Sequence, residues 1–288
     1  MPDVLTIKEA AAFLRLSERS LYELARGGRV PAAQIGGKWL FPRRQLERWL
    51  SAEAAHLADL PAILAGSHDP LLDWAVRQSG CGLALRAGGS FEGLAALAAG
   101  EAVAAATHLL DPDSGAFNEP AAREMLAGRG VVGLVWAWRE QGLMVPAGNP
   151  LGLASVTDLT RTGLRVVGRQ PRAGSHVLLG HLLAEAGVRV EQIGFLAQPA
   201  LAEDEVAAAV LEGRAEVGFG IRAEATARGL AFVPLIRERF DLVMARRHAF
   251  EPPLQKLLGF ARSPLFAARA GHMGGYDIGP TGQVAFNL

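Results

Sequence analysis

The sequence changes character near residue 50, and this change constrains the possible folds more than any other feature. Residues 1–52 contain nine Lys or Arg and five Asp or Glu, and the rest carries the opposite excess, so that the 288 residues hold 29 charges of each sign. A basic region on an otherwise neutral chain is typical of contact with a polyanion. We therefore expect a basic module at residues 1–50 and a separate, larger domain behind it.

Composition places both parts among globular proteins. Half of the residues are hydrophobic (50%), and no apolar run reaches the roughly 18 residues that a membrane-spanning helix needs. No secretory signal is visible at the N-terminus. Cys81 is the single cysteine, which excludes an internal disulfide and fits a reducing compartment. We therefore expect a cytoplasmic protein without membrane contacts.

The basic module shows the pattern of a winged helix-turn-helix. Thr6 and Glu9 match a capping box at the start of one helix, and Ser17 is placed to cap a second. Gly36-Gly37 predicts the turn of a hairpin, and a third helix is expected after it. This order resembles the excisionase and mercury-resistance-regulator type of winged DNA-binding domain.

The resemblance implies that this module binds double-stranded DNA with its second helix in the major groove. The candidate DNA-binding residues are Arg19, Ser20, Tyr22 and Arg26 on that helix, with Lys38 at the wing tip and Arg43 and Arg44 on phosphates. One small module buries little DNA, so we expect a homodimer on a two-fold site. A module that contacts protein instead of DNA is the open alternative.

Residues 51–61 form a linker or a connecting helix, and residues 62–288 alternate short apolar strands with helices. This alternation predicts an α/β fold with a mainly parallel sheet. Ligands of such sheets bind beyond the carboxyl ends of the strands. Four segments rich in Gly or Ser are expected there: Gly66–Asp69, Gly88–Gly93, Gly174–His176 and Gly218–Ile221. A serine at a helix N-terminus suits an anion, although serine is also a common cap.

Several sequence segments of the larger domain resemble the type II periplasmic-binding-protein fold in its regulator-fused version, in the group related to molybdate- and tungstate-binding proteins. These segments are Gly66–Asp73, His108–Asp111, Arg139–Leu143, Asn149-Pro150, Gly213–Ile221 and Glu238–Leu242. The resemblance implies a two-lobed domain with its ligand between the lobes. Lobe one would be 62–145 and 236–288 and lobe two 146–235, with crossings near Val145-Pro146 and Pro234-Leu235.

The resemblance also implies the ligand-binding residues. Ser67 and Ser90 would bind an oxyanion from lobe one, and Ser175 would bind it from lobe two. The full candidate set is Ser67, His68, Ser90, Arg169, Arg172, Gly174, Ser175, His176, Gly220 and Ile221, with the last two as backbone donors. Two positions depart from the family. His176 replaces a small hydroxyl residue, and Ala202-Glu203 replaces a Thr-His pair. An acidic side chain that points into the cleft would disfavour an anion.

These expectations combine into a ligand-responsive transcriptional regulator that senses molybdate or tungstate by lobe closure. Two alternatives stay open: a regulator that senses an organic anionic metabolite, and an oxyanion-storage protein with a vestigial DNA module. No enzyme is expected, because no nucleophile elbow or paired-carboxylate motif is present. No metal or cofactor is expected either, since His68, His108 and His176 lack the close spacing of metal ligands.

Overall fold

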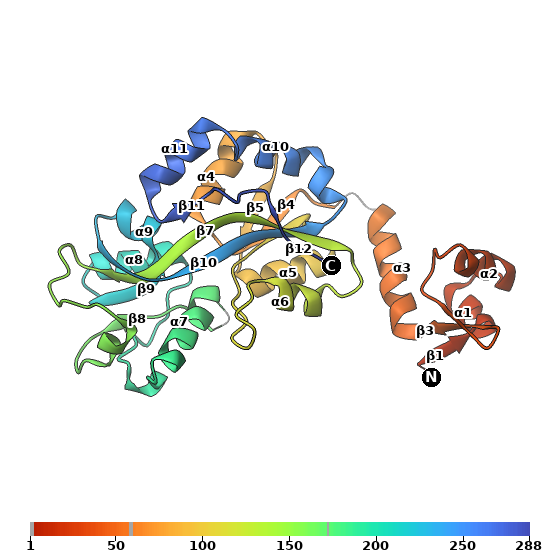
Figure 1. Ribbon diagram of the computed structural model, residues 1–288, viewed down its shortest axis with the longest axis horizontal. Coiled ribbons are helices and arrows are strands. Elements are labelled where there is room, and N and C mark those ends of the chain that lie inside the picture. The colour runs from red at the N-terminus through yellow and green to blue at the C-terminus, as the bar shows by residue number, and fades with distance from the viewer. Residues whose placement is uncertain (1–2, 58–59, 172) are drawn as a thin grey trace. The chain divides into compact units, whose positions relative to one another are not determined.

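The computed structural model describes residues 3–57, 60–171 and 173–288. The chain divides by its internal contacts into two compact units, Met1–Leu60 and Pro61–Leu288 (Figure 1). No helix of the described part is long and apolar enough to cross a membrane.

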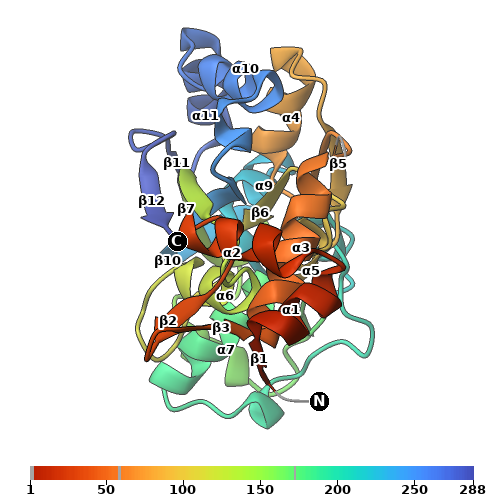
Figure 2. The same cartoon turned by 90° about the vertical axis from the view of Figure 1, so that its right-hand side faces the viewer.

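The first unit is a small three-stranded sheet with three helices. Its elements are β1 (Val4–Thr6), α1 (Ile7–Leu14), α2 (Glu18–Arg26), β2 (Ala33–Ile35), β3 (Lys38–Pro42) and α3 (Arg43–Leu57). The sheet has the order β1-β3-β2 with antiparallel pairs, and Figure 2 shows the β2–β3 hairpin beside the helices. The fully buried side chains Leu21, Phe41 and Leu46 fill its core. Helix α3 continues through Leu57, so residues 51–57 of the predicted linker are helical.

The predicted caps of the first two helices form. Thr6 accepts a hydrogen bond from the backbone of Glu9, whose carboxylate accepts one from the backbone of Thr6 at 2.8 Å. Ser17 accepts a hydrogen bond from the backbone of Ser20 at 3.1 Å. Each cap satisfies backbone donors that the first helical turn leaves free. Local sequence therefore determines where both helices begin.

The second unit is built on a nine-stranded mixed sheet in the order β5-β4-β6-β10-β7-β9-β8, with β11 and β12 also paired to β7. Its strands are β4 (Ile63–Gly66), β5 (Ala84–Ala87), β6 (Ala104–Thr107), β7 (Val131–Val145), β8 (Val166–Val167), β9 (Val217–Ile221), β10 (Ala231–Ala245), β11 (Tyr276–Asp277) and β12 (Val284–Asn287). Its α-helices are α4 (Pro70–Ser79), α5 (Ser90–Ala99), α6 (Glu119–Met125), α7 (Gly174–Glu185), α8 (Glu203–Leu211), α9 (Arg222–Ala227), α10 (Pro252–Phe260) and α11 (Pro264–Met273).

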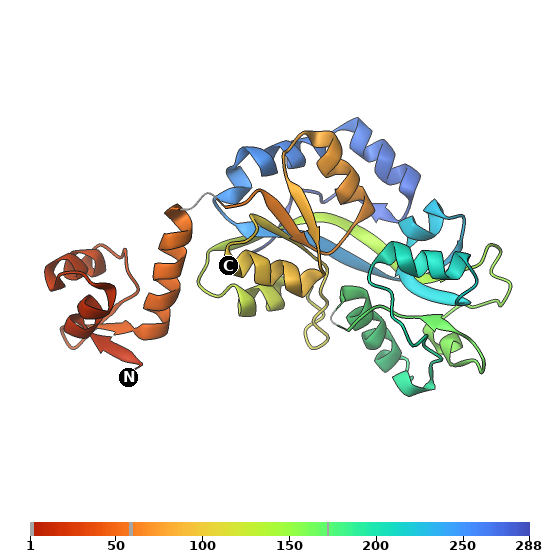
Figure 3. The same ribbon diagram turned by 180° about the vertical axis from the view of Figure 1, so that it is seen from behind.

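Helices cover both faces of the sheet in lobe one. Figures 1 and 3 show α4, α10 and α11 on one face and α5 and α6 on the other. Strand β10 contributes to both cores because successive side chains of a strand point to opposite faces. Leu242 and Met244 pack in the cluster that includes the α4 and α10 side chains, and Val243 packs with Leu94 of α5.

The two lobes are joined inside two long antiparallel strands. In lobe one, residues 241–244 of β10 pair with β6. In lobe two, residues 141–144 of β7 pair with β9. The chain therefore changes lobe near the middle of each strand and not at Val145-Pro146 and Pro234-Leu235, as the sequence had suggested. The polar residues Arg139 and Gln141 interrupt the apolar pattern of β7. They continue the strand because they find buried polar partners.

Helix α5 approaches the sheet closely at Gly93, and this contact allows a stability test. A Cβ atom on Gly93 would lie 2.6 Å from the Cα of Gly66 in β4, whereas one on Gly180 in α7 would meet nothing within 4 Å. Gly93→Ala should therefore destabilise the fold by about 1–3 kcal/mol. Gly180→Ala should leave stability unchanged or raise it by up to about 1 kcal/mol. Urea unfolding compares the two variants, and equal midpoints would contradict the close packing.

Candidate functional site

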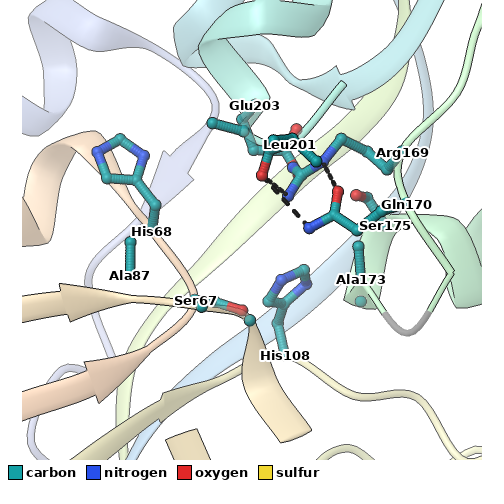
Figure 4. A pocket seen from close by; sticks show the side chains of 14 residues that line it. Ser67, His68, Ala87, His108, Arg169, Gln170, Ala173, Ser175, Leu201 and Glu203 are labelled. Carbon is teal, nitrogen blue, oxygen red and sulfur yellow. Dashed lines mark hydrogen bonds and ion pairs between the residues drawn. The ribbon is translucent and has the colours of Figure 1, made fainter. Parts of the chain in front are cut away.

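A cavity of about 260 Å³ lies between the two lobes of the second unit. It is formed where strands of lobe one end and helices of lobe two begin, and Figure 4 shows the side chains that face it. The lining side chains that carry polar atoms are those of Ser67, His68, His108, Arg169, Gln170, Ser175 and Glu203. Of the predicted ligand-binding set, the structure therefore brings five residues together here: Ser67, His68, Arg169, Gly174 and Ser175.

Ser67 lines the lobe-one side of the cavity, and Ser90 supports it from behind. Ser67 follows β4, and its Oγ lies 2.8 Å from the Oγ of Ser90 at the start of α5. Ser90 is fully buried, and its Oγ also accepts a hydrogen bond from the backbone N–H of His108 at 3.1 Å. Ser90 does not line the cavity itself. It holds Ser67 in place from beneath.

Ser175 stands on the opposite wall, in the first turn of α7. Its side chain is 1% exposed, and its Oγ has no hydrogen-bond partner within residues 3–57, 60–171 and 173–288. A buried hydroxyl without a partner is uncommon in folded proteins. The same helix turn contributes free backbone N–H groups and the positive end of the helix dipole. The geometry is that of a donor site that a ligand can complete.

Gly174 brings this helix turn against lobe one. A Cβ atom on Gly174 would lie 2.5–2.8 Å from atoms of the His108 ring, so only glycine permits this approach. His108 was considered in the sequence only as a possible metal ligand. Its position directly after β6, at the carboxyl edge of the sheet, is the signal that could have identified it as a wall of the pocket.

Arg169 and Glu203 form a buried ion pair at the lobe-two side of the pocket. Nη1 of Arg169 donates to Oε1 of Glu203 at 2.8 Å, and Nη2 donates to the carbonyl of Leu201 at 3.1 Å. The Glu203 residue is 3% exposed, and its Oε2 has no partner in the described part of the chain. Glu203 also lines the pocket, and its charge offsets that of Arg169.

A buried ionic network connects the pocket to the strands that cross between the lobes. Nδ1 of His108 lies 2.8 Å from Oε2 of Glu238 on β10, and Nε of Arg139 on β7 donates to Oε1 of the same carboxylate at 2.9 Å. Arg139 also donates to Asp69 at 3.0 Å, and the Tyr276 hydroxyl donates to Asp69 at 2.7 Å. Burial alone would raise the pKa of Glu238, but Arg139 and His108 lower it to about 2.

The other predicted ligand residues lie elsewhere. His176 is exposed on α7 and does not line the pocket. Gly220 and Ile221 are in β9, where their backbones pair with β7, so they are not backbone donors to the pocket. Gly220 instead provides space, because a Cβ atom there would lie 2.6 Å from Oε2 of Glu203. Arg172 lies outside the described residues.

Among the described residues, no three His, Cys, Asp or Glu side chains are placed to hold one metal ion. His68 and His108 both line the pocket, but His176 does not join them. The residues that gather here are hydroxyl, amide, imidazole and carboxylate groups around an open space. Such a set suits the binding of a small polar molecule.

The candidate DNA-binding residues of the first unit differ in solvent exposure. The side chain of Arg19 on α2 is 90% exposed, and Tyr22 is 47% exposed. Ser20, Arg26, Lys38 and Arg44 are also exposed. Arg43 is more enclosed, because its guanidinium pairs with Glu47 at 2.9 Å and lies over the ring of Phe13.

Comparison with known proteins identifies both units. Residues 73–262 match the family model of the PBP superfamily domain. The chain belongs to this superfamily. Residues 4–54 match the model of a helix-turn-helix domain. The predicted fold, a helix-turn-helix domain followed by a two-lobed α/β binding domain, is therefore confirmed. The two domains indicate a DNA-binding regulator with a ligand-binding domain.

A curated relative of this PBP-superfamily protein aligns with nearly the whole chain. The uncharacterized protein YvgK of Bacillus subtilis (strain 168) is 25% identical and aligns with 97% of this chain and 96% of its own length. The sulfate-binding protein SubI from Mycobacterium tuberculosis H37Rv has 16% identity and a TM-score of 0.51, with 74% of this chain and 85% of SubI covered.

A putative phosphate ABC transporter substrate-binding protein with bound phosphate from Clostridium perfringens has 11% identity and a TM-score of 0.52, with 73% and 96% covered. At these identities the likeness to solved structures shows the fold alone.

The ionised Glu238 should make the stability of the protein depend on acid pH. Its pKa is about 2 in the fold against an ordinary 4.5. The carboxylate therefore stabilises the fold above a pH of about 4.5, and this contribution, on the order of 3 kcal/mol, is lost as the pH falls toward 2. Urea unfolding between about pH 6 and about pH 3 measures it.

Glu238→Gln should be less stable than the parent at neutral pH, because Arg139 loses a buried partner at a cost of about 3–5 kcal/mol. It should also lose less stability on acidification. Glu212→Gln is the matched control, since Glu212 is exposed and pairs only with Arg214 at the surface. An unchanged acid slope in Glu238→Gln would contradict the role given to this carboxylate.

Proposed function

We propose that this protein is a transcriptional regulator whose signal is a small oxyanion bound between the two lobes. The observation that carries the proposal is the Ser175 hydroxyl, which is buried, without a partner among the described residues, and located at a helix N-terminus that lines the cavity. Ser67 offers a second hydroxyl from the facing lobe. Hydroxyls and helix N-termini are suitable donors for an anion.

The charges around the pocket support binding of an anion by hydroxyl groups and helix N-termini. Among the described residues, Arg169 is the only arginine that lines the pocket, and Glu203 holds it at 2.8 Å. The described part of the lining thus presents little net positive charge. An anion would be stabilised by donors that already point inward, without a dedicated counter-ion.

Two classes of anion remain candidates. Molybdate and tungstate come first from the sequence resemblance. An organic anionic metabolite is favoured by the side chains, because Glu203 faces the pocket and because a tetrahedral oxyanion fills only part of about 260 Å³. For comparison, one water molecule in liquid water occupies about 30 Å³.

The proposed mechanism is a shift between open and closed forms. A ligand that contacts Ser67 and Ser175 together binds the closed form better, so its binding favours closure. The shift is limited by the difference in affinity for the two forms. In a proposed homodimer, closure would change the spacing of the two DNA-binding modules and hence their fit to a two-fold DNA site.

Ligand binding can be tested by thermal denaturation with molybdate, tungstate, sulfate and phosphate. A bound anion should raise the melting temperature, since a ligand at about 100 times its Kd contributes about 2.7 kcal/mol. Ser175→Ala should weaken binding about tenfold or more by removing a donor. His176→Ala is the control, because His176 is adjacent but outside the pocket. No stabilisation by any anion, organic ones included, would refute the proposal.

DNA binding can be tested through its dependence on salt. Lys38 is exposed at the turn of the β2–β3 hairpin, where we place it on a phosphate. Lys38→Ala should weaken binding to a mixed-sequence duplex and reduce the slope of log K against log salt by about 1. Arg77→Ala, at an exposed position of α4, should change neither. An unaltered salt slope in Lys38→Ala would remove this residue from the interface.

A further inference from the structure

The pocket contains acceptor groups as well as donors, and these acceptors restrict its ligand. Glu203 lines the cavity at 3% exposure, and Arg169 is the one donor that the described residues supply to its carboxylate. An ionised carboxylate has about four acceptor positions. A buried carboxylate with most of these positions unfilled is costly unless another donor is supplied.

Glu203 cannot easily turn away from the pocket. Its Oε1 is held by Arg169, which is itself fixed by the carbonyl of Leu201 and the side chain of Gln170. Its Oε2 lies over Gly220, where only a residue without a Cβ leaves room for it. The carboxylate is therefore a preorganised part of the wall.

His108 stands on the facing lobe, across the pocket from Glu203. Its Nδ1 lies 2.8 Å from the carboxylate of Glu238, so this ring nitrogen carries a hydrogen and donates to that carboxylate. The described residues give Nε2 no hydrogen-bond partner, and the ring lines the pocket. Figure 4 shows His108 and Glu203 on different sides of the same space.

Resting on the proposed function, we infer that Glu203 selects an anion that brings its own hydrogen-bond donor. The ligand would be a singly protonated oxyanion or a carboxylate that also carries a hydroxyl group. Its anionic oxygens would accept from Ser67, Ser175 and the N-terminus of α7, and its O–H group would donate to Glu203. An anion without hydrogen supplies no donor to Glu203 and places its charge beside a carboxylate.

Matched pairs of anions test this selection in the full-length protein. Calorimetry compares inorganic phosphate with sulfate, which have similar size and shape but differ in the O–H group. It also compares L-lactate with propionate, which differ in one hydroxyl. The member with the O–H group should bind about tenfold or more tightly in at least one pair. A preference only within the first pair indicates a protonated oxyanion, and one only within the second pair indicates a hydroxy acid.

Glu203→Gln tests the residue directly, since an amide of nearly the same shape offers donors in place of an acceptor. The preference for the protonated or hydroxylated member should shrink or reverse, and sulfate and molybdate should gain affinity. Asp204→Asn is the matched control in the same helix turn, because Asp204 does not line the pocket. Circular dichroism and melting curves verify that both variants are folded.

The outcomes separate the inference from the function on which it rests. Sulfate or molybdate that binds as tightly as its protonated or hydroxylated counterparts would overturn the inference and leave the anion sensor in place. An unchanged preference in folded Glu203→Gln would remove Glu203 as the selecting residue. A protein that binds none of these anions would overturn the inference. Thermal denaturation with molybdate, tungstate and further organic anions then decides the proposed function separately.

Discussion

The buried ion pair of Arg139 and Glu238 is the interaction on which the two-lobed domain depends. Each residue stands on one of the two long strands that cross between the lobes, and both are almost inaccessible to solvent. A buried charge is tolerated only when it is paired and hydrogen-bonded. Asp69 and His108 complete the pairing, so the network ties the crossing strands to two loops at the pocket. A ligand that contacts His108 therefore acts beside the residues that join the lobes.

The pocket combines two kinds of chemistry. Helix N-termini and serine hydroxyls supply donors, while Glu203 supplies a carboxylate acceptor. Oxyanion sites built only from donors would accept molybdate or sulfate readily, and the resemblance of the sequence points in that direction. The carboxylate points in the other direction, toward an anion with an O–H group. We infer that Glu203, which departs from the family pattern, selects the ligand, and that the shared fold does not specify it.

Much of the architecture could be predicted from the sequence because it is encoded locally. The capping residues Thr6 and Ser17 start the first helices where expected, and strand–helix alternation predicted the α/β class. Ser67 and Ser175 could be placed at one site because the carboxyl ends of strands and the starts of helices meet at the same edge of a sheet. The long strands could not be recognised, since Arg139 and Gln141 interrupt the apolar pattern and their partners are distant in sequence.

The sequence by itself determined the two-domain organisation, the helix caps and the serines of the binding site, since each depends on residues within a few positions of one another. Only the tertiary structure decided which polar groups face the ligand. Gly220 and Ile221 pair with β7 and do not line the pocket, and His176 lies outside it. His108 and Glu203 line the pocket instead. The reason is physical. Whether a carboxylate or an imidazole faces a cavity depends on partners such as Arg169 and Glu238, and folding alone brings these together.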